Sequence, residues 1–148
     1  MKQEYAFAIR PTGILIEDGK LLLVKQRLKS GREWSLPGGK LERGERLGQG
    51  LIREMKEETG LDVAIDRLLY LCDGADNTLL HITFLLRRTG GELRLPDNSR
   101  EDNPITDVQF IPIDELTSLG FSPEFVRRIE EGFVDAARYA GSKSNIGL

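Results

Sequence analysis

The sequence predicts an α+β fold in which helices flank a mixed β-sheet, and three observations lead to this prediction. Short apolar runs bounded by Gly, Pro and Asp are typical of strands. A longer segment with apolar residues at every fourth position is typical of a helix. The two kinds of element interleave without regular strand–helix–strand alternation, which favours a mixed sheet over a doubly wound parallel sheet. We therefore expect a sandwich of the α/β/α type.

The length of the chain is typical of one compact domain. With 148 residues there is little room for a second core, so we expect a single domain over residues 1–148. Residues 1–5 and 141–148 are interpreted as tails, either mobile or, for 141–148, docked on the domain.

Composition and charge exclude several classes of protein. The formal net charge of −3 argues against sequence-independent binding to a nucleic-acid backbone, so no stable nucleic-acid partner is expected. The single cysteine, Cys72, cannot form an intramolecular disulfide, and no apolar run has the length of a signal peptide or membrane span. We expect a cytoplasmic protein without a membrane partner.

The first elements are two strands joined by a tight turn. The runs Ala6–Ile16 and Leu21–Val24 are apolar and β-prone, and the Asp18-Gly19 pair between them is a strong hairpin signal. A polar, basic stretch from Lys25 to Ser35 is then predicted to be a loop. It ends at Pro37-Gly38-Gly39, which breaks regular structure.

The strongest local pattern belongs to a helix from about Arg46 to Thr59. Leu47, Leu51 and Met55 recur every four residues through good helix formers. Gly60 is well placed to cap the C-terminus of this helix.

The second half of the chain is predicted to hold three further strands, a polar loop and two helices. The expected strands are Val63–Cys72, His81–Arg87 and Thr106–Ile111, with turns at residues 73–77 and at Gly90-Gly91 and an end at Pro112. Residues 95–104 are polar and bounded by proline, which predicts an exposed loop. Residues 113–119 are expected to form a short helix, and Ser122 and Pro123 to begin a last helix that runs to about Tyr139.

The predicted helix over residues 46–59 carries three carboxylates on one face. Glu54, Glu57 and Glu58 stand at positions i, i+3 and i+4, which places their side chains next to one another. Like charges at this spacing repel, and a divalent cation would compensate for the repulsion. All-oxygen ligands suit a hard cation, so we expect Mg²⁺ or Mn²⁺.

These glutamates lie within a longer motif, GKLERGERLGQGLIREMKEETGL, which resembles the Nudix box at every defined position and spacing. The defined positions are Gly39, Glu45, Arg53, Glu54, Met55, Glu57, Glu58, Gly60 and Leu61. The resemblance implies a Nudix-like α/β/α sandwich. It also implies a metal-dependent pyrophosphohydrolase that cleaves a nucleoside diphosphate linked to another moiety X into a nucleoside monophosphate and X-phosphate.

The resemblance also implies roles for single residues. Glu54, Glu57 and Glu58 are expected to bind the metal, together with the backbone carbonyl of Gly39. Arg53 and Glu45 are expected to orient these ligands as a pair. The general base is left open among Glu57, Glu58, Glu101 and Asp102.

Candidates for substrate binding lie just before the box. The turn at Gly38 and Gly39 lacks side chains and so allows a phosphate to approach closely. Arg27 and Arg32 could clamp phosphates, although a basic loop is more often simply exposed. Trp34 could stack on a base, although packing of its indole against the loop is at least as plausible a role.

Other chemically notable residues are interpreted as structural. His81 begins an apolar run and is expected to be a satisfied structural histidine, and Cys72 a small buried hydrophobe. Tyr5, Phe7, Phe84 and Phe110 are expected to be core or sheet-face residues.

Two classes of function remain open at this point. The first is the hydrolase, with its nucleotide-type substrate undetermined. The second is a catalytically silent binding module that senses a nucleotide, which is disfavoured because all four box glutamates are present. The sequence does not specify the oligomeric state, and the resemblance adds a homodimer as one alternative.

Overall fold

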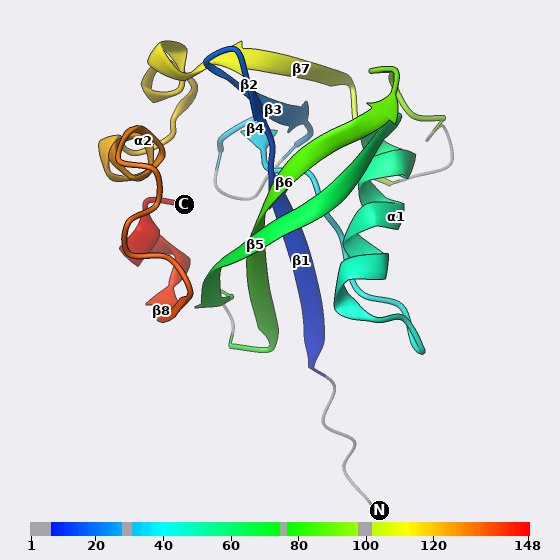
Figure 1. Cartoon of the computed structure of the whole chain (residues 1–148), viewed down its shortest axis with the longest axis horizontal. Helices are drawn as coiled ribbons and strands as arrows, with labels where there is room; N and C mark the ends of the chain where they lie inside the picture. Colours follow the sequence, from blue (N-terminus) through cyan, green and yellow to red (C-terminus); the bar gives the residue numbers. More distant parts are fainter. Residues whose placement is uncertain (1–6, 28–30, 75–76, 98–101) are drawn as a thin grey trace, which may run out of the picture.

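The computed structural model describes residues 7–27, 31–74, 77–97 and 102–148, shown in Figure 1. In these residues the strands are β1 (Ala8–Ile14), β2 (Ile16–Glu17), β3 (Lys20–Lys25), β4 (Trp34–Ser35), β5 (Leu61–Asp73), β6 (Leu79–Gly91), β7 (Asp107–Pro112) and β8 (Arg138–Ser142). The helices are α1 (Leu47–Thr59) and α2 (Pro123–Glu130), with 3₁₀ turns η1 (Ile113–Glu115), η2 (Thr117–Leu119) and η3 (Lys143–Ile146).

The strands form two sheets. In the first sheet the order is β1-β6-β5-β8, with β1 parallel to β6, β5 antiparallel to β6, and β8 parallel to β5. In the second sheet β3 pairs antiparallel with β2, β4 and β7. The predicted mixed sheet is therefore confirmed in the first of the two sheets.

The hairpin between β2 and β3 is closed as its sequence predicts. Asp18 and Gly19 have φ values of 50° and 73°. Left-handed φ at both central residues is what the tight hairpin turns favoured by Asp-Gly require.

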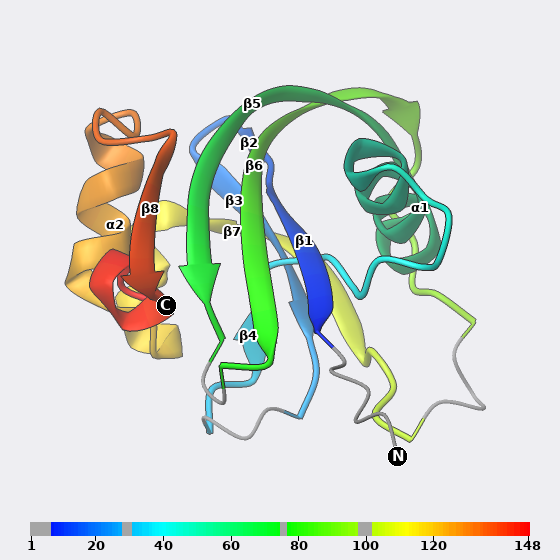
Figure 2. The same cartoon turned by 90° about the horizontal axis from the view of Figure 1, so that it is seen from below.

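Figures 1 and 2 both show the two helices on opposite sides of the strands. Leu51 and Met55 of α1 are fully buried in one apolar cluster with residues of β5 and β6. Phe125 and Ile129 of α2 are buried in a second cluster with Trp34 and residues of β3 and β5. The strands are therefore covered from both sides, which confirms the predicted α/β/α layering.

The ends of α1 agree with the predicted boundaries. The backbone N–H of Arg46 donates to Oε1 of Gln49 at 3.0 Å, which satisfies one donor before the first turn. Gly60 follows the helix at φ 80°, and its N–H donates to the Lys56 carbonyl at 3.0 Å. The left-handed conformation favours glycine at this cap.

The last helix is much shorter than its sequence predicts. We expected it to reach about Tyr139, but α2 ends at Glu130. Gly132 and Phe133 follow with φ values of 72° and 58°, which leave the helical region, and Phe133 turns into the core, where it is 4% exposed. Burial of this aromatic ring outweighs continuation of the helix.

The C-terminal residues dock on the domain, which decides between the two alternatives for 141–148. β8 adds a parallel strand to β5, and Ile146 in η3 is buried in the core together with Phe125. Residues 1–5, the other expected tail, lie outside the described residues.

Three further predictions need correction. Gly90 and Gly91 do not turn the chain but end β6, where Gly91 pairs with Leu61. The expected short helix over 113–119 is split into η1 and η2, and Pro112 is the last residue of β7. Phe7 is 71% exposed and does not belong to the core, while Tyr5 lies outside the described residues.

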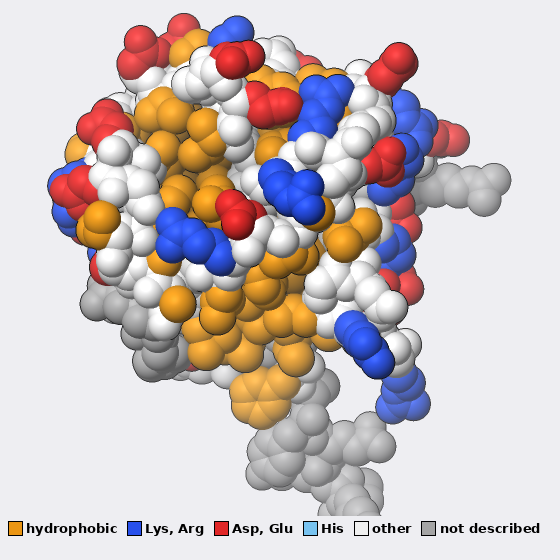
Figure 3. All heavy atoms as spheres, in the orientation of Figure 1, with side chains coloured by type: hydrophobic (Ala, Val, Ile, Leu, Met, Phe, Trp, Pro, Cys, Tyr) orange, Lys and Arg blue, Asp and Glu red, His pale blue; other side chains and the backbone are white. Residues whose placement is uncertain are grey.

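One face of the first sheet is only partly covered by α1. Strand pairing places Ile9 beside Leu80 and Leu71 beside Ile82, and these residues belong to or border the α1 cluster. Figure 3 shows apolar side chains gathered at the centre of the face drawn in Figure 1. No helix of the described residues is long and apolar enough to cross a membrane.

Candidate active site

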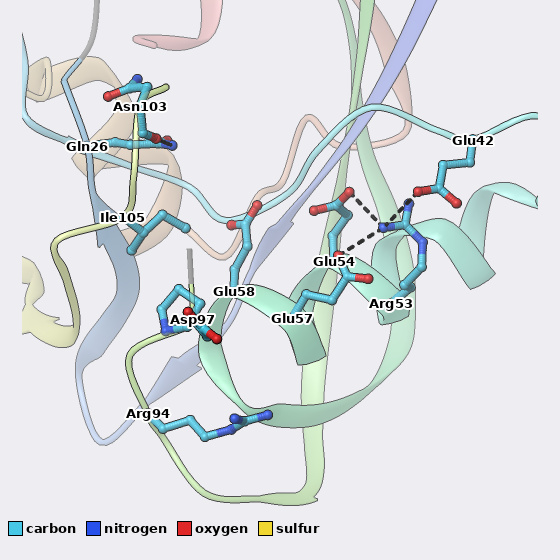
Figure 4. Close-up of a pocket in the computed structure, with 11 residues that line it drawn as sticks. Gln26, Glu42, Arg53, Glu54, Glu57, Glu58, Arg94, Asp97, Asn103 and Ile105 are labelled. Carbon is cyan, nitrogen blue, oxygen red and sulfur yellow. Dashed lines mark hydrogen bonds and ion pairs between the residues drawn. The ribbon is translucent and has the colours of Figure 1, made fainter. Parts of the chain in front are cut away.

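The three glutamates of the acidic face project from the last turns of α1. Side chains of Glu54 and Glu57 are 16% and 58% exposed, so the face passes from partly buried to open solvent. Glu58 accepts a hydrogen bond from the backbone N–H of Gly38 at 3.3 Å. Figure 4 shows the three carboxylates at one side of a cleft. The helical spacing thus brings them together as predicted.

The turn before the helix is held against β1. Thr12 forms an isolated antiparallel bridge with Gly38, and the N–H of Gly39 donates to the Pro11 carbonyl at 3.3 Å. A Cβ at position 39 would lie 2.6 Å from both carboxylate oxygens of Glu54. Glycine at this position is therefore what allows the Glu54 carboxylate to approach the backbone.

Arg53 links the carboxylates of the box. Its Nε and Nη2 donate to the two oxygens of Glu45 at 2.7 and 2.9 Å, and its Nη1 donates to Glu54 at 2.9 Å and to Glu57 at 3.1 Å. The hydrogen bonds from Arg53 lower the pKa of Glu45 to about 2, and Glu45 in turn raises the pKa of Arg53. The expected pairing of Arg53 with Glu45 is present as a bidentate ion pair.

Glu58 has a different electrostatic environment. Burial, followed by the charge of Glu54, raises the pKa of Glu58 to about 8, while the Gly38 N–H and the charge of Arg10 act in the opposite direction. Burial disfavours the charged form of a carboxylate, and a nearby like charge adds to this effect. A cation between Glu54 and Glu58 would reverse both contributions.

The residues suit a hard divalent cation by their chemistry. The donors are carboxylate oxygens and the backbone carbonyl of a glycine turn, which are ligands that Mg²⁺ and Mn²⁺ prefer. In the described part of the chain no three His, Cys, Asp or Glu side chains are already arranged around a metal position. Binding would require Glu54 and Glu57 to turn from Arg53 toward the cation.

The carboxylates face a cleft of about 600 Å³. This volume lies in the range of sites for small molecules and cofactors. The lining residues are Gln26, Glu42, Arg53, Glu54, Glu57, Glu58, Arg94, Pro96, Asp97, Asn103 and Ile105. Figure 4 shows that Gln26 and Asn103 lie on one side of the cleft and Arg94 on another.

Sequence reasoning missed five polar residues of this cleft: Gln26, Glu42, Arg94, Asp97 and Asn103. Asn103 joins two loops, because its Nδ2 donates to the Arg27 carbonyl at 2.6 Å and its Oδ1 accepts from the Arg27 N–H at 3.2 Å. Gln26 Nε2 donates to the Asn103 carbonyl at 2.7 Å. The polar, proline-bounded stretch over 95–104 is a signal for Asp97 and Asn103, although its pattern predicts only an exposed loop.

The five predicted substrate-binding residues all lie outside this lining: Arg27, Arg32, Trp34, Gly38 and Gly39. Arg27 is exposed and its backbone is held by Asn103. Arg32 is half-buried, with Nε donating to the Trp34 carbonyl at 2.8 Å and its guanidinium 4.2 Å from the Phe121 ring centre. Trp34 is 9% exposed within the core, and Lys25 Nζ lies 5.8 Å from its ring centre. The packing alternative for Trp34 is thus the one that the structure shows.

The four candidates for the general base differ in position. Glu57 and Glu58 line the cleft. Asp102 is exposed and is not part of the described lining, and Glu101 lies outside the described residues. Asp97 is the carboxylate that the 95–104 loop contributes to the cleft.

His81 and Cys72 lie on the strands and are both buried. Cys72 is fully buried, as expected of a small hydrophobe. His81 is 9% exposed, but its Nδ1 has no hydrogen-bond partner among the described residues, so the expectation of a satisfied histidine is wrong for this atom. Burial, followed by the charges of Lys143 and Arg10, lowers the pKa of His81 to about 4.

Fold and site together define an α+β protein with a carboxylate-bearing helix at a ligand-sized cleft. Residues 9–131 match the model of the NUDIX domain. An ADP-ribose pyrophosphatase of Methanocaldococcus jannaschii is 33% identical over 122 residues, which cover 79% of this chain and 69% of that protein. The chain belongs to the Nudix hydrolase family.

Solved structures show the same fold. A NUDIX hydrolase from Nitrosomonas europaea matches with a TM-score of 0.75 and 19% identity, over 95% of this chain and 80% of that one. An ADP-ribose pyrophosphatase from Streptococcus suis matches with a TM-score of 0.66 and 23% identity, over 91% and 97%. The predicted family and fold are confirmed, and the related pyrophosphatases agree with the predicted class of enzyme.

Proposed function

We propose that this chain hydrolyses a nucleoside diphosphate linked to another moiety X, with release of a nucleoside monophosphate and X-phosphate. The proposed metal ligands are Glu54, Glu57, Glu58 and the Gly39 carbonyl, with Mg²⁺ or Mn²⁺ as the cofactor. The M. jannaschii relative is named as an ADP-ribose pyrophosphatase, which supports a substrate of this class.

The observation that carries the proposal is the position of the three glutamates at a cleft of about 600 Å³. Three carboxylates alone would repel a diphosphate. Glu54, Glu57 and Glu58 would hold a divalent cation, which would neutralise charge on the diphosphate and lower the pKa of a bound water. The glycine turn beside Glu54 leaves backbone rather than a side chain next to this position.

The remaining residues of the cleft are proposed to position the reaction. Arg53 holds Glu45 with two hydrogen bonds and so fixes its own guanidinium beside Glu54 and Glu57. Arg94, which lines the same cleft, offers a cation for a phosphate or for the X moiety. The general base is proposed to be one of Glu57, Glu58, Glu101, Asp102 and, from its place in the cleft, Asp97.

Turnover of a nucleotide panel tests this function. Wild type, Glu57→Gln and Glu130→Gln would be assayed with Mg²⁺ or Mn²⁺ on ADP-ribose, sugar nucleotides, dinucleoside polyphosphates, NADH and deoxynucleoside triphosphates. We expect cleavage that depends on the cation, is lost in Glu57→Gln and is unchanged in Glu130→Gln, whose exposed side chain lies on α2. Tight binding of one nucleotide without turnover would support the sensor module instead.

The general base is tested with the substrate that the panel identifies. Asp97→Asn is expected to remove the acidic limb of the pH–rate profile if Asp97 is the base, whereas Glu57→Gln is expected to abolish cleavage at every pH. If the acidic limb of the pH–rate profile is still present in Asp97→Asn, Asp97 is not the general base.

A further inference from the structure

Basic side chains gather on the first sheet at a place that the proposed reaction does not use. Strand pairing sets Arg10 on β1 beside His81 on β6, and His81 beside Cys72 on β5. Cys72 in turn pairs with Gly141 of β8, and Lys143 follows directly after that strand. Paired residues share one face of a sheet, so Arg10, His81 and Cys72 lie on the same face.

Arg32 reaches the same region from the loop before β4. Its guanidinium stacks over Phe121, which belongs to the same buried cluster as Cys72. The charges of Arg32 and Arg10, after burial, lower the pKa of Lys143 to about 8. Lys143 is therefore within electrostatic range of Arg10, Arg32 and His81, and we call these four residues the basic cluster.

Among the residues that the structure describes, no carboxylate forms an ion pair with the basic cluster. Elsewhere Arg53, Arg127 and Arg128 are each paired with glutamates. Within the described residues no ion pair is formed by Arg10, Arg32 or Lys143, although all three are half-buried. Partial burial of three like charges costs free energy unless an opposite charge compensates for it.

A second observation points to the same conclusion. His81 is 91% buried, yet its Nδ1 has no hydrogen-bond partner in the described part of the chain. A buried polar atom without a partner costs about 1–3 kcal/mol, so a bound group that satisfies it would be favoured. Thr12 and Thr83, which are hydrogen-bonded to each other at 3.1 Å, add hydroxyl groups two residues along from Arg10 and His81.

The basic cluster is connected to the glutamates through β1. Thr12 bridges Gly38, and the charge of Arg10 acts on Glu58. We propose that the basic cluster is an anion subsite that holds a phosphate or carboxylate group of the substrate, separate from the diphosphate at the glutamates. This inference rests on the proposed function and narrows the substrates to nucleoside diphosphate derivatives that carry an additional anionic group.

Binding of inorganic phosphate in EDTA tests the subsite without catalysis. Without a cation the glutamates repel phosphate, so titration calorimetry reports on the basic cluster. We expect binding to be at least tenfold weaker in Lys143→Met and Arg10→Gln than in wild type. Lys143→Arg should retain it, because a guanidinium also binds phosphate. Lys20→Met, which removes an exposed lysine of β3, is the control and should bind phosphate with the affinity of wild type.

Thermal unfolding distinguishes the subsite from a structural role. Lys143→Met removes one of several mutually repelling charges, so its Tm is expected to equal or exceed that of wild type. A lowered Tm with unchanged phosphate affinity would overturn the proposal, and so would the absence of phosphate binding to wild type.

Inhibition of turnover by phosphate then tests whether the substrate occupies the same subsite. With Mg²⁺ and the best substrate of the panel, phosphate should compete with substrate in wild type and about tenfold more weakly in Lys143→Met. Phosphate that binds at Lys143 without competing would overturn the assignment to the substrate. If no panel compound is cleaved while phosphate binding still depends on Lys143, the proposed hydrolysis fails and the anion site stands.

Discussion

At the scale of single residues, the site depends on close approach and on one bidentate ion pair. Glycine at position 39 leaves room for Glu54, and Arg53 holds Glu45 with two hydrogen bonds while contacting Glu54 and Glu57. Both features follow from residue types that the box specifies. Each can be removed by one substitution.

Replacement of Gly39 by alanine tests the close approach. The new Cβ would lie 2.6 Å from both carboxylate oxygens of Glu54, so the carboxylate must move. We expect kcat/KM to fall about 100-fold, because a displacement of about 1 Å at a reacting group has effects of this size. Steady-state kinetics measures it.

The matched control for this substitution is Gly48→Ala, in the helix that carries Glu54. A Cβ there would meet Ile65 Cγ1 at 3.6 Å, which is an ordinary contact. We expect unchanged activity and a gain of about 1 kcal/mol in the free energy of unfolding from helix propensity. Equal activity of both variants would show that Gly39 has no special role.

Replacement of Glu45 by glutamine tests the orienting pair. The change retains the shape of the side chain but removes the charge that Arg53 binds at 2.7 and 2.9 Å. We expect kcat to fall about 10–100-fold, with weaker apparent affinity for Mg²⁺, as for other residues that orient metal ligands. A metal titration of activity measures both effects.

Glu33→Gln is the control for Glu45→Gln, because Glu33 is 69% exposed and its ion pair with Lys25 is long, at 3.7 Å. Glu33→Gln should have the kcat and the apparent affinity for Mg²⁺ of wild type. If Glu45→Gln retains full activity at low Mg²⁺, the pair does not orient the ligands.

At the scale of elements, the local sequence pattern was sufficient to predict both ends of α1, but it did not predict where α2 ends. Leu51 and Met55 lie on the buried face that their spacing predicts, and Gly60 caps the helix. For α2 the beginning at Ser122 was predicted correctly, but the end was wrong because Phe133 leaves the helix to enter the core. Tertiary burial of one ring overrode a favourable helical sequence.

Ser122 connects α2 with the C-terminal segment. Its hydroxyl accepts from the Phe125 N–H at 3.3 Å and donates to the Gly147 carbonyl at 3.0 Å. We expect Ser122→Ala to lower the free energy of unfolding by about 1–2 kcal/mol, because it removes an N-cap and a hydrogen bond to the tail. Urea denaturation measures the loss.

Ser118→Ala provides the comparison, because Ser118 is exposed and donates only to the nearby Glu115 carbonyl. Its effect should stay within about 0.5 kcal/mol. Similar losses in both variants would mean that the cap at Ser122 contributes nothing specific.

At the scale of the whole molecule, the sheets bring distant residues into one electrostatic environment. Arg10, His81 and Lys143 are far apart in sequence, and pairing of β1, β6, β5 and β8 joins them. The low pKa of His81 is a consequence of this assembly. The predictions of a single domain, a cytoplasmic location and a homodimer concern the same scale and stay predictions.

The pKa of His81 predicts how stability depends on pH. The folded state holds His81 neutral down to about pH 4, whereas the unfolded chain binds the proton near pH 6.5. Between these values the unfolded state binds more protons, so stability decreases as the pH falls from about 6.5 to 4. The contribution of His81 should reach about 3 kcal/mol.

Urea denaturation across this pH range, with wild type and His81→Gln, measures that contribution. Both proteins share their carboxylates, so the difference between the two curves isolates the histidine. We expect wild type to lose stability relative to His81→Gln on acidification. Parallel curves would contradict a buried neutral histidine.

The sequence by itself determined the parts of this protein that depend on local spacing. Three glutamates on one helical face, the glycine turn before them and the Asp-Gly hairpin are set by helical periodicity and by backbone conformations that few residues adopt. The family and its fold class follow from the same motif. None of these requires knowledge of which strands pair.

Only the tertiary structure decided what surrounds the glutamates. Gln26 reaches the cleft from the segment after β3, and Arg94 and Asn103 reach it from the connection between β6 and β7, while β8 places Lys143 beyond the strands that carry Arg10 and His81. Strand order and register arise from packing over the whole chain, because many pairings satisfy the same alternation of apolar residues. For this reason the cleft lining and the basic cluster could be recognised only after the sheets were assembled.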